Sequence, residues 1–494
     1  MMQRLTIERT LTIVLFILIF AIAARIPVDT DTWWHLRSGE SILQSGIIYT
    51  DPYSFTLYGQ PWIDHSWGAQ VIMTLFWNLG GYLGLTIYMA SLATAGMIFV
   101  WLACTGNGYL RAFAIVLGAA TAAVFWSPRP QMISFFLSAV ILYLLLDFQR
   151  SKHDRLWLIP VIMAIWGNLH AGFSIGFILM AALIAGEALG NLFVRHREPK
   201  VNWRGVRKLC LIFVVSLAAI CINPYGLQML TVPFQTIGIG ALQNFIQEWN
   251  SPNFHERQML PFLALLFLTF GAAGASARRL TWTDFILYSG TAYLALNAGR
   301  NVALFAVVVT PMLTTYVNSV LEERNWVLHP QRRATRMIAF ANVAIIVLVG
   351  LGATVKVLAV MTPQSVREAL EMTLPVEAVE YLNEEIPQGN LFNSYNWGGY
   401  LTYFAPEYPV FVDGRTDLYG DDFLTNAYLN TAMGGEGYRE VLDQYGINVL
   451  LIESGSGLAR ALKVSPDWDV IFEDNGASVI VRRTPISAQG TLDG

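Results

Sequence analysis

The sequence LTIVLFILIFAIAA, residues 11–24, is followed six residues later by DTWWHLR, residues 31–37. The first stretch is apolar throughout, as in a helix that crosses a membrane. The second gathers an acid, two tryptophans, a histidine and an arginine, and Asp29 lies just before it. Two carboxylates beside a histidine and an arginine can remove a proton, hold a cation or bind an anionic headgroup. This junction therefore predicts a functional site at the edge of a membrane.

The composition is that of a protein that crosses the bilayer several times. Of 494 residues, 54% are hydrophobic and 13% are charged, whereas a soluble domain has roughly 25% charged residues. Eleven apolar stretches approach the ~20 residues that a membrane helix needs. They are residues 8–25, 81–104, 110–127, 131–148, 156–169, 171–192, 208–223, 259–277, 282–298, 301–320 and 337–360. The sequence predicts a polytopic α-helical membrane protein with about eleven transmembrane helices.

Lysine and arginine residues predict the orientation, because they are enriched in cytoplasmic loops. With the N-terminus inside, the inner loops hold eighteen basic residues and the outer loops hold five. The five are Arg25, Arg37, Arg129, Arg257 and Arg300. We therefore expect a multi-pass protein of the cell (cytoplasmic) membrane, with its N-terminus inside and its C-terminal domain outside.

The composition changes after Met361. Residues 362–494 carry twenty acidic and seven basic side chains, a net charge of −13, and residues 1–361 carry +9. So acidic a domain binds nucleic acid poorly, and no nucleic-acid partner is expected. Its alternating pattern predicts a small extracytoplasmic α/β domain. The predicted elements include a helix at 376–385 and strands at 390–393, 410–412, 448–452, 469–472 and 478–481. Residues 1–361 then form the transmembrane domain, in which residues 26–66 are a first outer loop with juxtamembrane helices.

Polar and turn-forming residues gather at the ends of the predicted spans, and these clusters all fall on the outer side. Besides Asp29, Asp31, Trp33, Trp34, His35 and Arg37, they contain His65, Arg129, Gln131, Asn168, His170, Arg300, Trp397, Asp413 and Arg415. Unrelated structural features would scatter over both sides of the membrane. Their common side makes these residues candidates for a site that binds a substrate.

Each candidate also has a structural interpretation. Asp29 and Asp31 can solvate the start of a loop, and Arg129 can reach from a span end to lipid phosphates. His170 can cap a helix, and Asp413 suits the first position of a type I β-turn. The sequence has no Gly-rich phosphate loop, His-Glu-x-x-His, Cys-x-x-Cys or Gly-x-Ser-x-Gly motif, so we expect neither ATP hydrolysis nor structural zinc.

The arrangement resembles the GT-C superfamily of membrane glycosyltransferases. The resemblance lies in Asp31-x-Trp-Trp-His-x-Arg37 at the start of a long outer loop, on about eleven spans with an outer α/β domain. The loop is similar to that of oligosaccharyltransferase catalytic subunits and, in rhythm, to that of lipid-dependent mannosyltransferases and aminoarabinose transferases. Residues 396–400 and 413–416 look like relatives of the oligosaccharyltransferase Trp-Trp-Asp-Tyr-Gly segment and its downstream aspartate, although Tyr395-Asn396-Trp397 replaces Trp-Trp-Asp.

This resemblance implies transfer of a sugar from a polyprenyl-phosphate carrier in the lipid bilayer to an acceptor glycan, lipid or protein on the outer face. Asp31 then matches the catalytic aspartate and Asp29 its companion. An inverting displacement needs a base within about 3 Å of the acceptor proton, and fixed cations stabilise the leaving phosphate. Arg37, Arg129, His170 and Arg300 are candidates for those cations. Trp33 and Trp34 can stack on a sugar or sit at the membrane interface.

A divalent cation, Mg²⁺ or Mn²⁺, can replace part of the positive charge, with Asp29 and Asp31 as its oxygen ligands. The sequence leaves this cofactor open. It also leaves two other functions open, a transporter or flippase of a lipid-linked or small solute, and a non-catalytic protein on the same scaffold. Transporters typically carry inverted repeats and polar residues at mid-membrane, and the sequence shows no repeat and few charges there.

Overall fold

The structure, a computed structural model, describes residues 5–151, 153–193, 200–240, 247–327 and 333–487. The chain divides into two compact units. Unit 1 comprises Met1–Arg25, Leu83–Leu230 and Ile246–Met361, and unit 2 comprises Ile26–Tyr82, Thr231–Phe245 and Thr362–Gly494. Five basic residues on which the predicted orientation rests lie outside the described residues: Arg4, Lys152, Arg195, Arg197 and Arg332.

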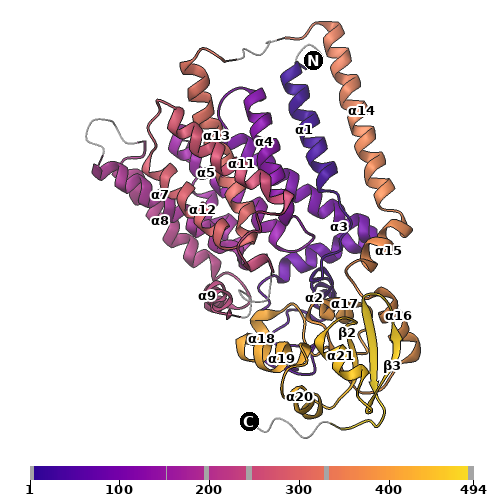
Figure 1. Ribbon diagram of the computed structural model, residues 1–494. Helices are drawn as coiled ribbons and strands as arrows, with labels where there is room; N and C mark the ends of the chain where they lie inside the picture. Colours follow the sequence, from indigo (N-terminus) through magenta and orange to yellow (C-terminus); the bar gives the residue numbers. More distant parts are fainter. Residues whose placement is uncertain (1–4, 152, 194–199, 241–246, 328–332, 488–494) are drawn as a thin grey trace. The chain divides into compact units, whose positions relative to one another are not determined.

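Unit 1 is built from helices. Its α-helices are α1 (Ile7–Ala23), the later part of α3 (Trp67–Ala103), α4 (Gly108–Ala122), α5 (Gln131–Ser151), α6 (Leu158–Trp166), α7 (Ser174–Phe193), α8 (Trp203–Ile220), α11 (Leu260–Ala275), α12 (Trp282–Asn297), α13 (Val302–Glu323) and α14 (Arg336–Val360). Short 3-10 segments connect them: η2 (Ala123–Phe125), η3 (Ala171–Phe173), η4 (Gly226–Thr231), η5 (Gln247–Trp249), η6 (Arg257–Met259) and η7 (Gly299–Asn301). Each of the eleven predicted apolar stretches coincides with one of these α-helices (Figure 1).

Within the described ranges, seven helical segments are long and apolar enough to cross a membrane. They are Trp67–Ala103, Gly108–Phe125, Gln131–Ser151, Ala171–Phe193, Arg257–Ala275, Gly299–Glu323 and Arg336–Val360. Helices satisfy their own backbone hydrogen bonds, which is what a segment in lipid requires. The chain is thus a polytopic α-helical membrane protein, as the sequence predicts.

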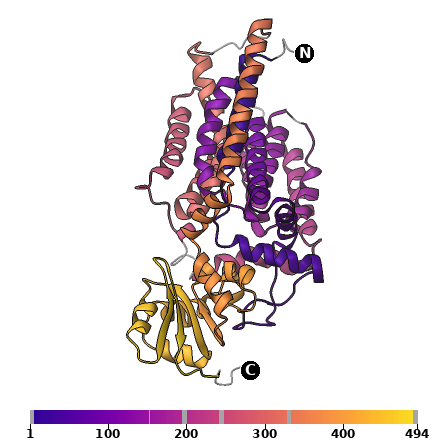
Figure 2. The same cartoon turned by 90° about the vertical axis from the view of Figure 1, so that its right-hand side faces the viewer.

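Polar side chains fix the helix ends of unit 1. The side chains of Thr6, Asn107 and Thr335 accept backbone N–H groups at the starts of α1, α4 and α14. At the other end of α1, the Lys356 ammonium of α14 donates to the carbonyls of Ala21 and Ala24, at 2.8 and 2.5 Å. A cation suits the unpaired carbonyls at a helix C-terminus. These bonds fasten α14 alongside α1 (Figures 1 and 2).

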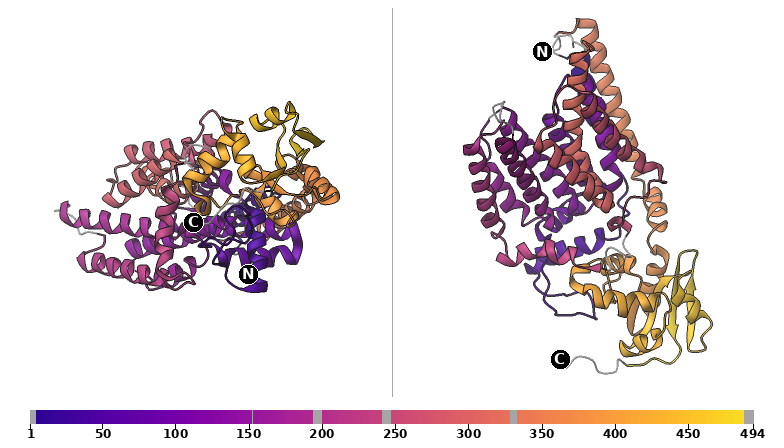
Figure 3. Two further views of the ribbon diagram at one scale, coloured as in Figure 1. Left: turned by 90° about the horizontal axis from the view of Figure 1, so that it is seen from below. Right: turned by 60° about the vertical axis from the view of Figure 1, so that its left-hand side comes forward.

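The core of unit 1 lies around α13. This helix packs against α4, α5, α11 and α12, and all its residues from Val302 to Tyr316 except Ala303 are buried. A second group of contacts joins α7 to α8 and α12, and α8 to α6 (Figure 3). The resulting bundle places the short segments η5 and η7 in contact with each other.

Helix α3 is kinked at two glycines. Gly80 has φ −161° and ψ 17°, and Gly81 has φ 54° and ψ −130°. The positive φ of Gly81 lies in a region that side chains disfavour, so glycine suits the bend. The kink falls where the chain passes from unit 2, which ends this segment at Tyr82, to unit 1, which resumes at Leu83.

Unit 2 combines a four-stranded sheet with short helices. The helices are α2 (Thr32–Ser45), the first part of α3, α9 (Val232–Ile237), α15 (Pro363–Glu371), α16 (Val376–Glu385), α17 (Tyr395–Phe404), α18 (Thr416–Asp422), the π-helix η8 (Phe423–Leu429), α19 (Asn430–Ala432), α20 (Tyr438–Gln444) and α21 (Gly457–Lys463). The strands are β1 (Asn390–Asn393), β2 (Ile447–Glu453), β3 (Trp468–Glu473) and β4 (Ala477–Arg482). Their order in the sheet is β1-β2-β4-β3 (Figure 2).

The centre of this sheet is β2, which pairs in parallel with β1 and antiparallel with β4. Residues Ile447–Ile452 are all buried, as expected of a strand that is covered on both faces. Helix α16 packs against β3 and β4, α20 against β2, and α21 against β3. Helix α17, which follows β1, packs against α2 of the long outer loop.

One predicted strand, residues 410–412, is wrong. These residues are not part of the sheet. Val410 instead exchanges backbone hydrogen bonds with the outer loop, since its N–H donates to Tyr53 O at 3.1 Å and its carbonyl accepts from Phe55 N at 3.2 Å. The side-chain carbonyl of Asn393 accepts the N–H of Phe411 at 2.8 Å. An apolar run cannot reveal which distant backbone it will pair with.

Candidate active site

Asp31 immediately precedes helix α2, and Asp29 holds it in place. The N–H of Asp31 donates to Oδ1 of Asp29 at 3.0 Å. The Asp31 side chain does not act as the N-cap of this helix. Both aspartates are partly exposed. An accessible carboxylate on a fixed backbone is what a general base requires.

Three glycines let other segments approach Asp31 closely. A Cβ at Gly414 would lie 2.8 Å from the Cγ of Asp31 and 3.2 Å from Nε1 of Trp34. A Cβ at Gly399 would lie 2.6 Å from the carbonyl oxygen of Thr30, and one at Gly398 would lie 2.7 Å from the Cα of Asp413. The glycine pair of α17 and the segment around Gly414 thus bring backbone against the start of α2.

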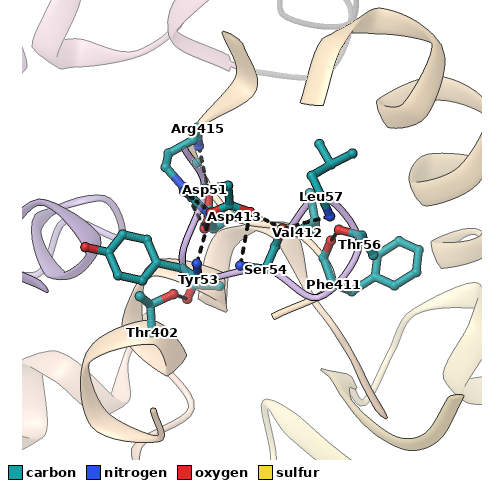
Figure 4. Close-up of polar contacts among 12 residues, drawn as sticks. Asp51, Tyr53, Ser54, Thr56, Leu57, Thr402, Phe411, Val412, Asp413 and Arg415 are labelled. Atoms are coloured by element: carbon teal, nitrogen blue, oxygen red, sulfur yellow. Dashed lines mark hydrogen bonds and ion pairs between the residues drawn. The ribbon is translucent and has the colours of Figure 1, made fainter. Parts of the chain in front are cut away.

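The segment that contains Gly414 is fixed by a buried ion cluster (Figure 4). The Arg415 guanidinium donates to both oxygens of Asp413, at 2.7 to 3.0 Å, and to Oδ1 of Asp51 at 2.5 Å. The rings of Tyr53 and Trp62 lie 5.0 and 4.9 Å from the guanidinium carbon, within the range of cation–π attraction. All three charged side chains are completely buried.

The charge of Arg415 persists inside this cluster. Burial by itself lowers the pKa of Arg415, but Asp413, Tyr419 and Asp51 together raise it well above its ordinary value. The sequence suggests Asp413 and Arg415 as substrate-binding residues. In the structure they make these hydrogen bonds to each other and to Asp51, all within unit 2. They join the outer loop, through Asp51, to residues 413–415.

A second buried network surrounds His35. The Gln70 amide donates to Oδ1 of Asp64 at 2.7 Å and lies 3.3 Å from Nδ1 of His35. The rings of His35 and Trp34 lie 3.6 Å apart between centroids. Asp64 is 1% exposed, and its Oδ2, like Oε1 of Gln70, has no hydrogen-bond partner among the described residues. This network links α2 to the residues around the start of α3.

Burial raises the pKa of Asp64 to about 7, and the nearby carboxylate of Asp417 adds to the rise. Hydrogen bonds from Ser66 and Gln70 and the charge of Arg415 act in the opposite direction, but burial dominates. Between pH 4 and 7 the folded protein therefore keeps a proton that the unfolded chain has released, since the ordinary value is 3.8. Stability contributed by this group is present at low pH and is lost as the pH rises to about 7.

Asp64→Asn should flatten this pH dependence. A shift of about three pH units corresponds to at most about 4 kcal/mol of unfolding free energy, because each unit is about 1.4 kcal/mol. The wild-type protein should lose thermal stability in detergent between pH 5 and 8, and the variant should lose much less. Asp467→Asn, at an exposed position, is the matched control and should keep the wild-type slope. If thermal stability falls equally with pH in all three proteins, the raised pKa of Asp64 is contradicted.

The aromatic candidates of the outer loop are core residues of unit 2. Trp33 has no exposed surface, and its ring packs against five others, those of Trp77, Tyr82, Tyr400, Tyr403 and Phe404. Trp34 is 6% exposed. These rings fix α2 against α3 and α17, which holds the Asp31 end of α2 in place.

Three more candidates of unit 2 have local partners. Trp397 is buried, and its indole donates to the carbonyl of Thr373 at 3.2 Å. Arg37 pairs with Glu40 at 3.6 Å, one turn further along α2. Nδ1 of His65 lies 2.9 Å from the hydroxyl of Ser66.

In unit 1, two candidate arginines gather around Glu248. Arg129 donates to Glu248 at 3.0 Å, and Arg300 lies over the ring of Trp249, 4.2 Å from its centroid. Burial acts to raise the pKa of Glu248, but Arg129 and Arg300 hold it below its ordinary value. Two arginines and one glutamate leave a net charge of +1. This cluster, named here the Arg129–Arg300 group, can bind an anion.

The remaining candidates of unit 1 support local structure. Nδ1 of His170 lies 2.7 Å from the hydroxyl of Ser134 and accepts the N–H of Gly172 at 3.0 Å, which caps η3. The Asn168 amide donates to the carbonyls of Ala164 and Ile222, at 2.8 and 2.7 Å. The Gln131 amide donates to the hydroxyl of Ser127 at 3.1 Å.

Asp29 and Asp31 are the two carboxylates that the sequence suggests as ligands of a divalent cation. Mg²⁺ and Mn²⁺ favour several oxygen ligands around one point. Across the described ranges, no group of three or more histidine, cysteine, aspartate or glutamate side chains is arranged to hold a metal ion. A divalent cation at Asp29 and Asp31 stays a prediction.

The sequence does not single out Asp51, and it places Asp64, Glu248 and Trp249 in the outer polar clusters without assigning them to the site. Asp51 and Asp64 resemble ordinary loop acids, and their burial depends on residues far along the chain. Glu248 and Trp249 stand in a long outer connection, and that position was their one detectable signal. An acid beside a tryptophan, facing arginines at two span ends, is an arrangement that only the folded chain shows.

The chain is similar in structure to solved glycosyltransferases. One is the archaeal oligosaccharyltransferase AglB from Archaeoglobus fulgidus, in complex with an inhibitory peptide and a dolichol-phosphate. It is 13% identical, with a TM-score of 0.57 over 90% of this chain and 69% of that chain. ArnT from Cupriavidus metallidurans in the apo state is 13% identical, with a TM-score of 0.50 over 94% and 95%. The arabinofuranosyltransferase AftD from mycobacteria is 13% identical, with a TM-score of 0.51 over 98% and 40%.

No family model matches the sequence, and no curated protein sequence matches it. At such low identity the structural likeness shows the fold. All three solved proteins are GT-C glycosyltransferases, so the fold of this chain is the GT-C fold, as the resemblance in the sequence implies. Chemistry must be argued from the site itself.

Proposed function

We propose that the protein is a glycosyltransferase that moves a sugar from a polyprenyl-phosphate carrier to an acceptor on the outer face of the membrane. The observation that carries the proposal is the placement of Asp31. The residue is partly exposed, its backbone is held by Asp29, and a Cβ at Gly414 would lie 2.8 Å from its Cγ. The GT-C fold supports the same conclusion, because the solved proteins of this fold that the chain resembles are glycosyltransferases.

In the proposed reaction Asp31 is the general base. It takes the proton of an acceptor hydroxyl or amide, and the acceptor atom attacks the anomeric carbon of the donor sugar. The bond from that carbon to the phosphate oxygen breaks, and polyprenyl phosphate leaves with the electron pair. Attack from the face opposite the phosphate inverts the anomeric centre. General base catalysis of this kind typically contributes about 10²- to 10⁴-fold to a rate.

The lipid donor requires a group that binds phosphate. The AglB structure contains a dolichol-phosphate, and phosphate esters are held well by arginine guanidinium groups. We assign this role to the Arg129–Arg300 group, with its net positive charge.

The proposal is tested with the full chain reconstituted in liposomes. The donors are a panel of undecaprenyl-phosphate hexoses and pentoses with radiolabelled sugars, and a detergent extract of cell envelope supplies acceptors. Wild-type protein should move label out of the lipid fraction, in proportion to time and protein. Asp467→Asn should do the same. Failure to consume any donor, combined with solute flux into sealed vesicles, would identify a transporter instead.

A further inference from the structure

The position of Gly414 is set by contact with Asp31 and Trp34. Its backbone φ lies outside the left-handed region, so the conformation alone would accept any residue. A Cβ there would lie 2.8 Å from the Cγ of Asp31, and closer still to its Oδ1. Real Cβ atoms do not approach other atoms so closely. A larger residue at 414 would therefore require the Asp31 carboxylate to move from its place.

The segment around Gly414 cannot easily move away from Asp31, because Arg415 anchors it. The Arg415 side chain is bound on one side by Asp413 and on the other by Asp51 (Figure 4). The backbone N–H of Arg415 also donates to Oδ1 of Asp413 at 3.0 Å, and the N–H of Thr416 donates to Gly414 O at 2.9 Å. These bonds fix the peptides on both sides of Gly414.

Helix α17 also packs closely against the residues that precede Gly414. The carbonyl of Val412 and the Cα of Asp413 lie against Gly398, and the carbonyl of Thr30 lies against Gly399. Two adjacent glycines thus hold the residues that precede Gly414 and the residue that precedes Asp31. The start of α2 and residues 412–414 rest on one turn of one helix.

We propose that residues 413–415 form a positioning segment for Asp31, in which the buried Arg415 pair fixes Gly414 and the backbone of Gly414 sets the place of the carboxylate. Neither Gly414 nor Arg415 touches the substrate in this scheme. The effect that this segment has on catalysis depends on the proposed function, in which Asp31 is the base. The contact between Gly414 and Asp31 is independent of that role and is tested separately.

The contact is tested by a double-mutant cycle on thermal stability in detergent. Gly414→Ala should lower the unfolding midpoint, because the new methyl group meets the Asp31 carboxylate. Asp31→Ala removes the atoms that are met, so Gly414→Ala should cost much less in the Asp31→Ala background. Gly455→Ala is the matched control, since a Cβ there meets nothing within 4 Å, and it should leave the midpoint unchanged. An equal cost of Gly414→Ala in both backgrounds would overturn the proposed contact.

The positioning role is tested by kinetics with the donor found active in the liposome assay. Gly414→Ala should lower kcat by about a hundredfold, because a base displaced by about 1 Å loses roughly that much. The KM for the lipid donor should change less than about threefold, since this variant leaves the Arg129–Arg300 group intact. Gly455→Ala should keep both constants. Unchanged kcat in Gly414→Ala would overturn the positioning role.

Two outcomes separate this inference from the proposed function. If wild-type protein transfers no sugar, the function fails, while the stability cycle still tests the contact. If Gly414→Ala does not fold, the double variant Asp31→Ala/Gly414→Ala decides the matter. Folding of the double variant alone supports the contact, and failure of both variants to fold overturns it.

Discussion

We expect Asp31→Asn to lower the rate of sugar transfer by about 10²- to 10⁴-fold, the range that a general base contributes. Asparagine has the shape of aspartate but cannot accept the acceptor's proton. The thermal unfolding midpoint should change little, because the Asp31 side chain does not cap α2. The rate is measured as loss of label from the lipid fraction in liposomes. Full activity in Asp31→Asn would remove Asp31 from the role of base.

The variant Asp29→Asn distinguishes the role of Asp29 from that of Asp31. Its amide oxygen can still accept the N–H of Asp31, which is the bond that Asp29 makes in the structure. We therefore expect a loss of less than about tenfold, well below the full contribution of a general base. A loss as large as that of Asp31→Asn would show that the charge of Asp29 takes part in the reaction. Asp467→Asn again serves as the control for both variants.

The largest effect on stability is expected from Arg415→Ala. Removal of the guanidinium leaves Asp51 and Asp413 buried without their cation, and breaking a buried pair in this way costs about 3–5 kcal/mol. The measurement is the free energy of unfolding from denaturant titration in detergent micelles. Arg483→Ala is the control, because its ion pair with Asp469 is half exposed, and pairs at a surface are typically worth about 1 kcal/mol or less.

A compensating variant tests the reason for the loss. Arg415→Met combined with Asp51→Asn and Asp413→Asn removes the uncompensated charges together with the cation. Such replacement of a whole buried ion group is often neutral or stabilising. The triple variant should therefore be more stable than Arg415→Ala. If it is equally unstable, the loss comes from packing against Tyr53 and Trp62 rather than from charge.

Much of the helical architecture could be predicted from the sequence, because apolar stretches long enough to cross a bilayer leave a strong local signal. Helix α16 and strand β1 begin and end as predicted, at 376–385 and 390–393. Both have a clear local pattern of apolar residues. The predicted strand at 410–412 is wrong because its structure depends on a distant segment. Val410 pairs with the outer loop near Tyr53. Nothing near Val410 in the sequence specifies that partner.

The candidate site could be predicted only in part. Asp29 and Asp31 stand out locally, because two acids beside two tryptophans at a span end are unusual. The roles of Gly398, Gly399 and Gly414 depend on how closely three backbone segments approach one another. The structure also shows that Arg415 binds two aspartates, its neighbour Asp413 and also Asp51, which lies 364 residues away along the chain. Pairs at such separation leave no trace in a single sequence.

The discontinuity of unit 2 has a consequence for how the protein is made. A ribosome that adds about 5–20 residues per second needs about 20–70 s to pass from Asp51 to Arg415, which are 364 residues apart. Throughout that time the early segment of the unit, Ile26–Tyr82, lacks the strands and the cation that complete its interior. The growing chain must therefore keep this segment soluble and unaggregated until translation is nearly finished. Unit 2 is the last part of the molecule to mature, although it contains some of the first residues to be synthesised.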